Sequence, residues 1–338
     1  MKEQFYAGFD IHKKSIAICV KNQMGETIQE KSIRANPIAV ARWVENAPKP
    51  FAAAMEATLF TGWVYDELCR YSDDVRVGNS VMLSYISKSK NKSDKVDAKK
   101  LADLLRVDLI PQVYMLPRYA RDIREFLRYR NWLVRQSVRY KNKISGLLMM
   151  NGIEYDASKL HNKGYFYDFL DSLNNEKKLV ELLRLSRSQL EILKEFERRT
   201  KKLLYKQPGI KERVELLTSV PGVGEITALT WALEIWDPHR FSSSEKAKSY
   251  CGLTPSQKES AGKERRMPIS KQRNKHIQWV VVEASKIAVH RVKEPELVQI
   301  YQKVAERKNR NAATMAVARK LVEWLLAVDK RKTPFRAR

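Results

Sequence analysis

Cysteine is scarce in this sequence, with three residues (Cys19, Cys69 and Cys251) in 338 positions. Three widely separated cysteines form neither a disulfide framework nor a zinc-ligand cluster, so a reducing cytoplasmic environment is expected. Long apolar runs are also missing: the first residues hold no apolar stretch of signal-peptide length, and no uncharged run reaches the about 18 residues of a membrane span. These absences exclude a disulfide-stapled secreted domain and predict no membrane partner.

Acidic residues are few relative to basic ones: 39 Asp and Glu stand against 64 Lys and Arg, which gives a formal charge of +25 at pH 7. The excess is spread along the chain, so much of the folded surface should be positive. Such a surface attracts polyanions, DNA or RNA, largely through counterion release. The simpler interpretation, a basic protein kept soluble by its charge, stays open at this point. The length predicts two or three domains.

Strands alternate with helices in the first third of the chain, which predicts a mixed α/β domain over residues 1–115. The β-prone, apolar runs and the amphipathic runs between them fall into regular segments. The predicted strands cover 5–11, 15–20, 27–33, 51–57 and 74–78, and the predicted helices cover 38–46 and 62–71.

The middle of the chain, residues 116–208, contains no convincing strand. Two long stretches with apolar residues three and four apart are separated by an interruption near 151–166. This pattern predicts a helical hairpin, an antiparallel coiled-coil arm that pairs chains into a dimer or tetramer. The stripe expected to pack on the second helix is Leu182, Leu185, Ile192, Leu193 and Phe196.

A mainly α-helical domain is predicted for residues 209–338. The segment 216–235 reads as a helix, a Pro-Gly-Val-Gly turn and a second helix, which resembles a helix-hairpin-helix. Its glycines would let backbone N–H groups approach a phosphate, although a purely structural turn is an equal alternative. Residues 252–272 are expected to form a loop, followed by helices from about His276.

Four acidic residues occupy positions suited to a common site. Asp10 ends an apolar strand, Glu56 ends the buried run FAAAME, and Asp94 and Asp97 lie three apart on one helical face. Buried carboxylates need a cation or strong hydrogen bonds. Neutralisation by nearby lysines is one solution. A shared site for Mg²⁺, or Mn²⁺, is the favoured one, since carboxylate oxygens suit these ions.

Two strand-end acids followed by two helical acids are the arrangement of the RNase H-like nucleases, in which four carboxylates hold two metal ions. Lys95 and Lys99, which flank Asp94 and Asp97, would then contact the phosphates of a nucleic acid.

With these motifs in place, the sequence resembles the DEDD transposases of the insertion-sequence 110 family, also described as bridge-RNA-guided recombinases. The N-terminal resemblance lies in GFDIHKK, AMEAT and SDKVDAKKLADLL. The C-terminal resemblance lies in SVPGVGEITALTWALEI, RFSSSEKAKSYCGLTPSQKESAGKERRMPISK and NAATMAVARKLV. The resemblance implies a RuvC-like domain that carries the four acids, a coiled-coil arm and a C-terminal transposase domain.

The resemblance also implies a nucleophilic serine in the segment after GL-x-P, where Ser260 corresponds. The sequence departs from the family pattern at Ala261, where Ser-Gly-Gly is frequent, and at Arg273, where glycine is usual. On chemistry alone Ser256 and Ser270 would be equal candidates, since a serine hydroxyl needs help to become a nucleophile. Four basic residues around the serine could bind a phosphate: Lys258, Lys263, Arg265 and Arg266.

The implied activity is that of a DNA transposase or recombinase. Ser260 would attack a DNA phosphate beside metal-binding acids from a different subunit. An element-encoded bridge RNA would pair with donor and target DNA, as guide RNA does in Cas9-type effectors. The expected setting is a bacterial or archaeal cytoplasm, in association with the nucleoid.

Two alternatives remain. A Holliday-junction resolvase-like endonuclease would use the four acids without the serine, and a non-enzymatic scaffold would use neither. His12 and Tyr250 are not expected to be required for catalysis.

Overall fold

The structure, a computed structural model, describes residues 4–86, 93–173, 176–260, 263–269 and 272–336, and for 256–268 it describes the backbone only. The chain divides into two compact units, Met1–Arg118 and Tyr119–Arg338. None of the helices in the described ranges is long and apolar enough to cross a membrane.

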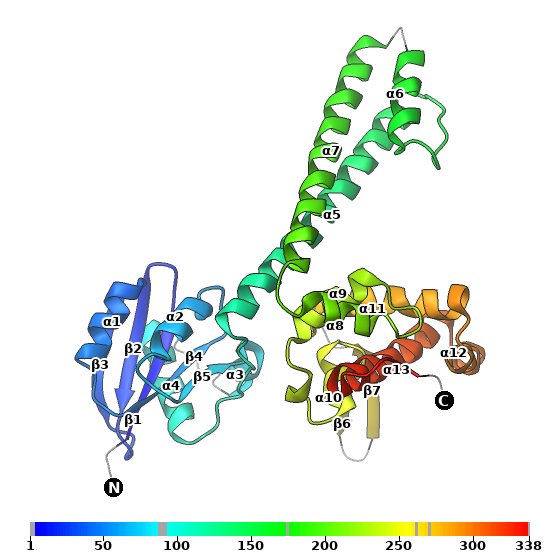
Figure 1. Cartoon of the computed structure of the whole chain (residues 1–338). Helices are drawn as coiled ribbons and strands as arrows, with labels where there is room; N and C mark the ends of the chain where they lie inside the picture. The colour runs from blue at the N-terminus through cyan, green and yellow to red at the C-terminus, as the bar shows by residue number, and fades with distance from the viewer. Residues whose placement is uncertain (1–3, 87–92, 174–175, 261–262, 270–271, 337–338) are drawn as a thin grey trace. The chain divides into compact units, whose positions relative to one another are not determined.

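The first unit is a five-stranded sheet with helices on both faces (Figure 1). The strand order is β3-β2-β1-β4-β5, with β1, β2 and β3 antiparallel and β4 and β5 parallel to β1. The elements are β1 (Phe5–Ile11), β2 (Ser15–Lys21), β3 (Thr27–Arg34), α1 (Pro37–Glu45), β4 (Phe51–Glu56), α2 (Thr61–Leu68), β5 (Val75–Gly78), α3 (Ser80–Ile86) and α4 (Asp94–Arg106).

The alternation of side chains along β1 and β4 separates two apolar layers. Phe9 and Met55 pack with Trp43 of α1 and Leu68 of α2 in the larger core. Ala54 faces the other way, into a smaller cluster with Leu101 and Leu105 of α4. The mixed α/β interpretation of this region is confirmed, and the predicted segments agree with the observed ones apart from their ends. The short helix α3 was not predicted.

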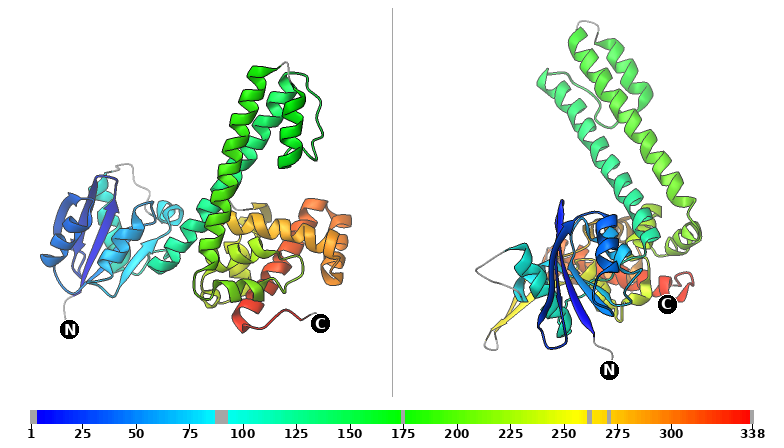
Figure 2. Two further views of the ribbon diagram at one scale, coloured as in Figure 1. Left: turned by 45° about the horizontal axis from the view of Figure 1, so that its top comes forward. Right: turned by 90° about the vertical axis from the view of Figure 1, so that its left-hand side faces the viewer.

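The second unit begins with an arm. The long helices α5 (Arg118–Met150) and α7 (Lys177–Tyr205) run side by side, and α6 (Lys163–Ser172) lies beside them (Figures 1 and 2). The core of the arm mixes aliphatic and aromatic side chains, among them Leu148, Phe166 and Leu183. Arg187, 2% exposed, stacks on the Phe166 ring and donates to the main-chain oxygen of His161 at 3.2 Å, which ties α7 to α6.

The stripe predicted to pack on α7 is not the one that packs within the chain. Leu182, Leu185, Ile192 and Phe196 are 43–57% exposed, and Leu193, the fifth residue of the predicted stripe, is half-buried. The buried positions are instead Leu179, Leu183, Leu190 and Leu204. The helix carries two apolar stripes, and the sequence periodicity alone did not distinguish the inward one. The exposed residues of the outward stripe are spaced by three, seven and four residues, and Gln189 occupies the position between Leu185 and Ile192.

The remainder of the second unit is mostly helical, as predicted. Its helices are α8 (Ile210–Leu217), α9 (Glu225–Ile235), η1 (Pro238–Arg240), α10 (Ser244–Tyr250), α11 (Lys275–Ile287), η2 (Ala288–Val292), α12 (Pro295–Arg307) and α13 (Arg310–Arg331). The apolar helix α9 lies at the centre of this core, and Trp231 is fully buried there.

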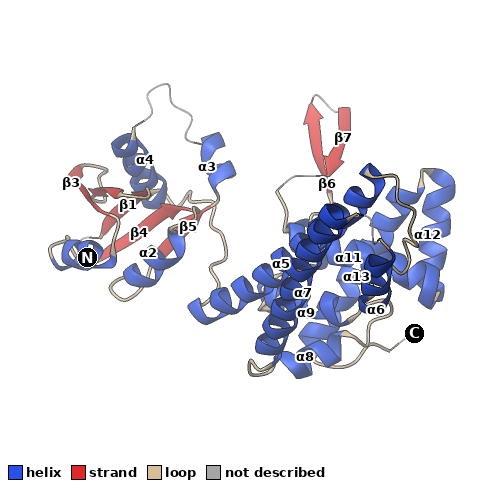
Figure 3. Cartoon of the chain, turned by 90° about the horizontal axis from the view of Figure 1, so that it is seen from above, coloured by secondary structure: helices blue, strands red, loops and turns tan. Residues whose placement is uncertain are grey.

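The prediction of a loop over 252–272 is wrong. The strands β6 (Pro255–Ser260) and β7 (Lys263–Ile269) form an antiparallel hairpin, drawn in red in Figure 3. The segment is highly charged and lacks apolar alternation, so the usual sequence signal of a strand is missing. Ser260 pairs with Lys263 at the far end of the hairpin.

Candidate active site

The sheet places Asp10 and Glu56 on the same face. β1 and β4 are parallel, with Gly8 opposite Ala54 and Phe9 opposite Met55. The next residue on each strand is Asp10 and Glu56. Because side chains alternate along a strand, both acids point to the face of Gly8 and Ala54, which is the face that α4 covers.

Gly8 lets α4 lie close against that face. A Cβ atom at this position would stand 2.1 Å from the main-chain oxygen of Ala98 and 2.6 Å from the nitrogen of Ala102. Any side chain would therefore push α4 away from the sheet. The close approach places the N-terminal turn of α4, which carries Asp94 and Asp97, near the end of β1.

The α4 N-terminus is suited to acidic residues. The Ser93 hydroxyl caps it by accepting from the N–H of Val96 at 3.4 Å. Asp94 and Asp97 follow in the first turn, where the positive end of the helix dipole favours negative charge. The local sequence Ser-Asp-Lys-Val-Asp thus starts the helix and supplies two carboxylates.

His12 lies between acids from the two elements. Its Nε2 atom is 3.1 Å from Asp10 Oδ2 and 3.3 Å from Asp94 Oδ1. The possible ligand atoms of these three residues all lie within 4.8 Å of one another. Burial raises the pKa of Asp10; the nearby His12 opposes this shift, while Asp94 and Asp97 add to it. Negative charge therefore accumulates where a divalent cation would relieve it.

The other two predicted acids take different positions. Asp97 Oδ1 accepts from Lys100 at 3.0 Å, yet its charge still acts on Asp10. Glu56 is half-buried at the end of β4. Within the described part of the chain, no hydrogen bond or ion pair joins the Glu56 carboxylate to the other three acids.

The lysines predicted to contact nucleic acid are not equivalent. Lys95 is exposed. Lys99 forms an ion pair with Glu30 of β3 at 2.6 Å, and this bond raises the pKa of the lysine. The lysine that touches a predicted acid is Lys100 instead.

The predicted serine and its basic neighbours lie on the β6–β7 hairpin. The backbone register pairs Lys258 with Arg265 and Gln257 with Arg266. The side chains of Ser260, Lys258, Lys263, Arg265 and Arg266 lie outside the described part of the structure, as does the whole of Ala261 and Gly262.

The glycine turn between α8 and α9 has a packing role. Gly222 has φ of +79°, and a Cβ atom there would be 2.5 Å from the Cβ of Ala288. Glu225 occupies the first turn of α9 and is paired with Lys201. A carboxylate at this helix end disfavours a phosphate there, so these contacts favour the structural interpretation of the turn.

His12 was not expected to be required, and its place between two acids was missed. A usable signal was present: His12 follows Asp10 by two residues, directly after the strand, so its ring is close in the sequence to the carboxylate at the end of β1. Tyr250, the other residue considered, bonds to a polar network of the second unit, since its hydroxyl lies 3.3 Å from the main-chain oxygen of Glu234.

Comparison with known proteins supports a single family. A DEDD transposase model of the IS110 group matches residues 7–150, and the model described as "Transposase IS116/IS110/IS902 family" matches residues 214–302. The chain is 24% identical to the transposase for insertion sequence element IS1111A of Coxiella burnetii, over 99% of this chain and 92% of that protein.

The transposase for insertion sequence element IS1328 of Yersinia enterocolitica is also 24% identical, over 95% of this chain and 96% of that protein. The two family models include the acid-bearing strands and helix of the first unit and the hairpin of the second. The chain therefore belongs to the IS110 family of transposases.

Proposed function

We propose that this protein is the DNA transposase, or recombinase, of an insertion sequence, and that it cuts and rejoins DNA with a serine nucleophile beside metal-binding acids. The observation that carries the proposal is the meeting of Asp10 from β1 and Asp94 from α4, with the pKa of Asp10 raised by burial and by its acidic neighbours. Such a raised pKa in an accumulation of acids is typical of functional sites.

The residues present fit a divalent cation. Asp10 and Asp94 offer hard oxygen ligands at the meeting of β1 and α4, and Asp97 and Glu56 lie on the elements beside them. A bound Mg²⁺ or Mn²⁺ would neutralise the scissile phosphate and stabilise the leaving oxygen. The strand order β3-β2-β1-β4-β5 supports a RuvC-like, RNase H-like assignment of this unit.

Ser260 is the proposed nucleophile, by its correspondence to the family serine. Its hydroxyl oxygen would form a bond to phosphorus while the bond from phosphorus to the leaving DNA oxygen breaks, which leaves a phosphoserine link. Lys258, Lys263, Arg265 and Arg266 share the hairpin with Ser260 and would bind the phosphate. A projecting hairpin is suited to reaching an acid site on another subunit.

The proposed partners are donor DNA, target DNA, a bridge RNA and further copies of this chain. The charge of +25 suits a protein that holds several nucleic acids. The outward stripe of α7, which includes Leu185, Ile192 and Phe196, supports pairing of arms. We keep the division into residues 1–115, 116–208 and 209–338 as a proposal.

The test combines the protein, a transcript of the element's flanking end, supercoiled DNA with donor and target sites, and Mg²⁺. Recombinant junctions and denaturant-stable protein–DNA adducts are scored for Ser260→Ala, Asp97→Ala and Ser256→Ala, a matched control on the same strand. We expect the first two variants to abolish junctions, Ser260→Ala to abolish adducts, and Ser256→Ala to retain both.

Cutting by Ser260→Ala together with its loss in Asp97→Ala would identify a resolvase-like metal nuclease and reject the serine. Omission of the transcript tests the RNA separately, since full activity without it would reject guidance by RNA.

Sedimentation tests the pairing of arms. Ile192→Glu should dissociate the assembly, whereas Lys194→Glu, at an exposed residue outside the stripe, should not. A monomeric wild type would reject the pairing role.

A further inference from the structure

The β6–β7 hairpin depends on its base for its orientation. Among the described residues its two strands pair only with each other, and such a two-stranded sheet has little rigidity of its own. Ser260 is the last of the six residues of β6, so it lies about 17–20 Å from the base. A small rotation at the base therefore becomes a large displacement at Ser260.

The two ends of the hairpin are joined at Tyr250 and Asn274. The main-chain N–H of Asn274 donates to the oxygen of Tyr250 at 3.0 Å, and its Nδ2 donates to the Tyr250 hydroxyl at 3.2 Å. Gln278 secures the entering chain by donating to the oxygen of Gly252 at 2.6 Å. A Cβ atom on Gly252 would meet the Cβ of Arg273 at 2.5 Å, so the entering and leaving chains are in direct contact.

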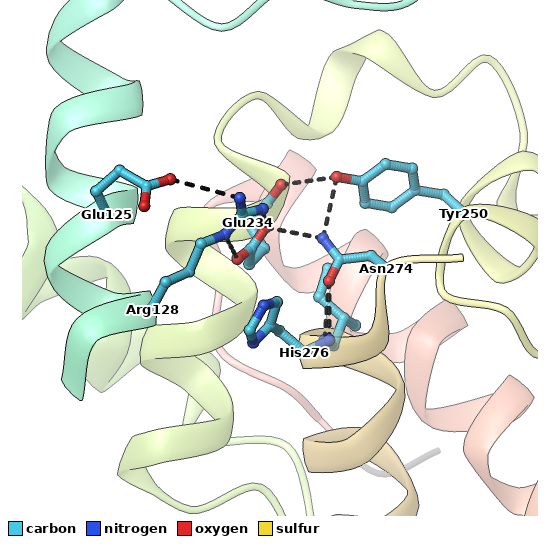
Figure 4. Close-up of polar contacts among 7 residues, drawn as sticks. Glu125, Arg128, Glu234, Tyr250, Asn274 and His276 are labelled. Carbon is cyan, nitrogen blue, oxygen red and sulfur yellow. Dashed lines mark hydrogen bonds and ion pairs between the residues drawn. The ribbon is translucent and has the colours of Figure 1, made fainter. Parts of the chain in front are cut away.

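Glu234 of α9 accepts hydrogen bonds from both Tyr250 and Asn274 (Figure 4). Its carboxylate is fully buried, and Oε2 accepts from Asn274 Nδ2 at 2.8 Å. Its main-chain oxygen accepts from the Tyr250 hydroxyl at 3.3 Å. Asn274 in turn caps α11, because its Oδ1 accepts from the N–H of His276 at 3.0 Å. One acidic residue thus connects the chain before the hairpin with the chain after it.

The same carboxylate binds the arm. Arg128 of α5 donates through Nε at 2.9 Å and through Nη2 at 3.0 Å. Burial raises the pKa of Glu234, but the Arg128 bonds and charge, aided by Asn274, outweigh it and hold the pKa below its ordinary value. Glu234 is therefore ionised at neutral pH. Its carboxylate links Arg128, at the root of the arm, to Asn274, at the base of the hairpin.

We propose that Glu234 is a positioning residue that fixes the hairpin of Ser260 to the root of the arm. The inference rests on the proposed role of Ser260. A shift of about 1 Å in a reacting group reduces a rate by about 100-fold. Loss of the clasp, the hydrogen-bonded group of Glu234, Asn274 and Tyr250, should therefore slow the formation of the phosphoserine adduct. It should leave nucleic-acid affinity unchanged, since the Glu234 carboxylate is buried beneath the surface.

The variant Glu234→Gln tests the positioning role. Glutamine has nearly the same shape as glutamate, but it has one acceptor oxygen instead of two and cannot accept from both Arg128 and Asn274 as the carboxylate does. Asp329→Asn is the matched control. Asp329 is a buried carboxylate of the same unit that accepts from Arg213 at 2.8 and 2.7 Å and from Trp231 at 2.9 Å, with no bond to the hairpin or its ends among the described residues.

A third variant separates the clasp from helix capping. Asn274→Ser keeps a good N-cap for α11 but removes the Nδ2 group that reaches Glu234 and Tyr250. Deuterium exchange of the backbone amides of 255–269 reports on the hairpin without any need for activity. Adduct formation and the affinities for DNA and for the transcript are measured alongside.

We expect Glu234→Gln and Asn274→Ser to speed exchange in the hairpin by about tenfold. Adduct formation should fall by about 10- to 100-fold with affinities within about twofold of wild type. Asp329→Asn should change neither hairpin exchange nor adduct formation. Unchanged exchange in Glu234→Gln, or an equal change in Asp329→Asn, would overturn the proposal. Adducts that persist in Ser260→Ala would reject the serine alone, because the exchange result decides the clasp independently.

Discussion

The acids of the two units have opposite surroundings. Among the described residues, the charged groups that act on Asp10 in the first unit are His12 and the carboxylates of Asp94 and Asp97, and the pKa of Asp10 is raised. Glu234 and Asp329 in the second unit each accept two bonds from an arginine, and the pKa of Glu234 is lowered. A carboxylate with a raised pKa among other acids indicates a ligand site, whereas a buried carboxylate that forms an ion pair with an arginine indicates a structural role.

The largest expected effect is on activity in the first unit. Asp10→Asn should reduce recombination by at least about 10³-fold, because the proposed divalent cation would lose a ligand and with it several kcal/mol of charge stabilisation. The thermal midpoint should stay level or rise, since one of several mutually repelling acids is removed. Junction counting and calorimetry check the two halves. A clear fall in the thermal midpoint would show that Asp10 has a structural role, like Glu234 and Asp329, and would contradict the proposed difference between the two units.

A large effect on stability is expected in the second unit. Asp329→Ala leaves the largely buried guanidinium of Arg213 and the N–H of Trp231 without their acceptor, and should lower the free energy of unfolding by about 3–5 kcal/mol. Urea denaturation measures it. The control is Glu195→Ala, which breaks an exposed pair with Arg198 and should cause no measurable change. Equal stability of Asp329→Ala and wild type would contradict the structural role of Asp329.

An added divalent cation should have a smaller effect, which is a gain in stability that depends on the first unit. Mg²⁺ or Mn²⁺ at about 100 times its dissociation constant should stabilise the protein by about 2.7 kcal/mol. The gain should vanish in Asp10→Asn and persist in Glu234→Gln. Thermal shift titrations with Ca²⁺-free buffers measure it, and a gain that survives in Asp10→Asn would place the cation elsewhere.

The smallest effect is on the pH dependence of stability. The folded-state pKa of Glu234 lies below its ordinary value of 4.5, so its contribution is present above that pH and is lost as pH falls through the lowered pKa. The stability difference between wild type and Glu234→Gln should thus be constant above about pH 6 and shrink below pH 4.5. A difference that grows on acidification would show that Glu234 is protonated in the folded protein.

Local patterns predicted the parts of the site that depend on local geometry. Helical spacing predicted the shared face of Asp94 and Asp97, and the apolar runs predicted that Asp10 and Glu56 end their strands. The common face of Asp10 and Glu56 follows from the pairing of β1 with β4, which no local pattern contains. The position of His12 between Asp10 and Asp94 was not predicted, because Asp94 is far away in the sequence.

The features that the sequence did not reveal depend on tertiary contacts. The inward stripe of α7 is selected by α5 and α6 rather than by its own periodicity. The strands β6 and β7 carry charges where strands normally carry apolar residues. Glu234 meets Arg128 and Asn274 at separations of 106 and 40 residues, so no short motif announces their bond.

The contact between Gly8 and α4 makes the spacing of the acids a property of the main chain. The helix is seated by backbone atoms of Ala98 and Ala102 against a residue with no side chain. Its outer surface is therefore separable from its seating. Lys95 and other solvent-facing positions of α4 can be exchanged while the acids keep their places, whereas even a single methyl group at Gly8 would displace them together.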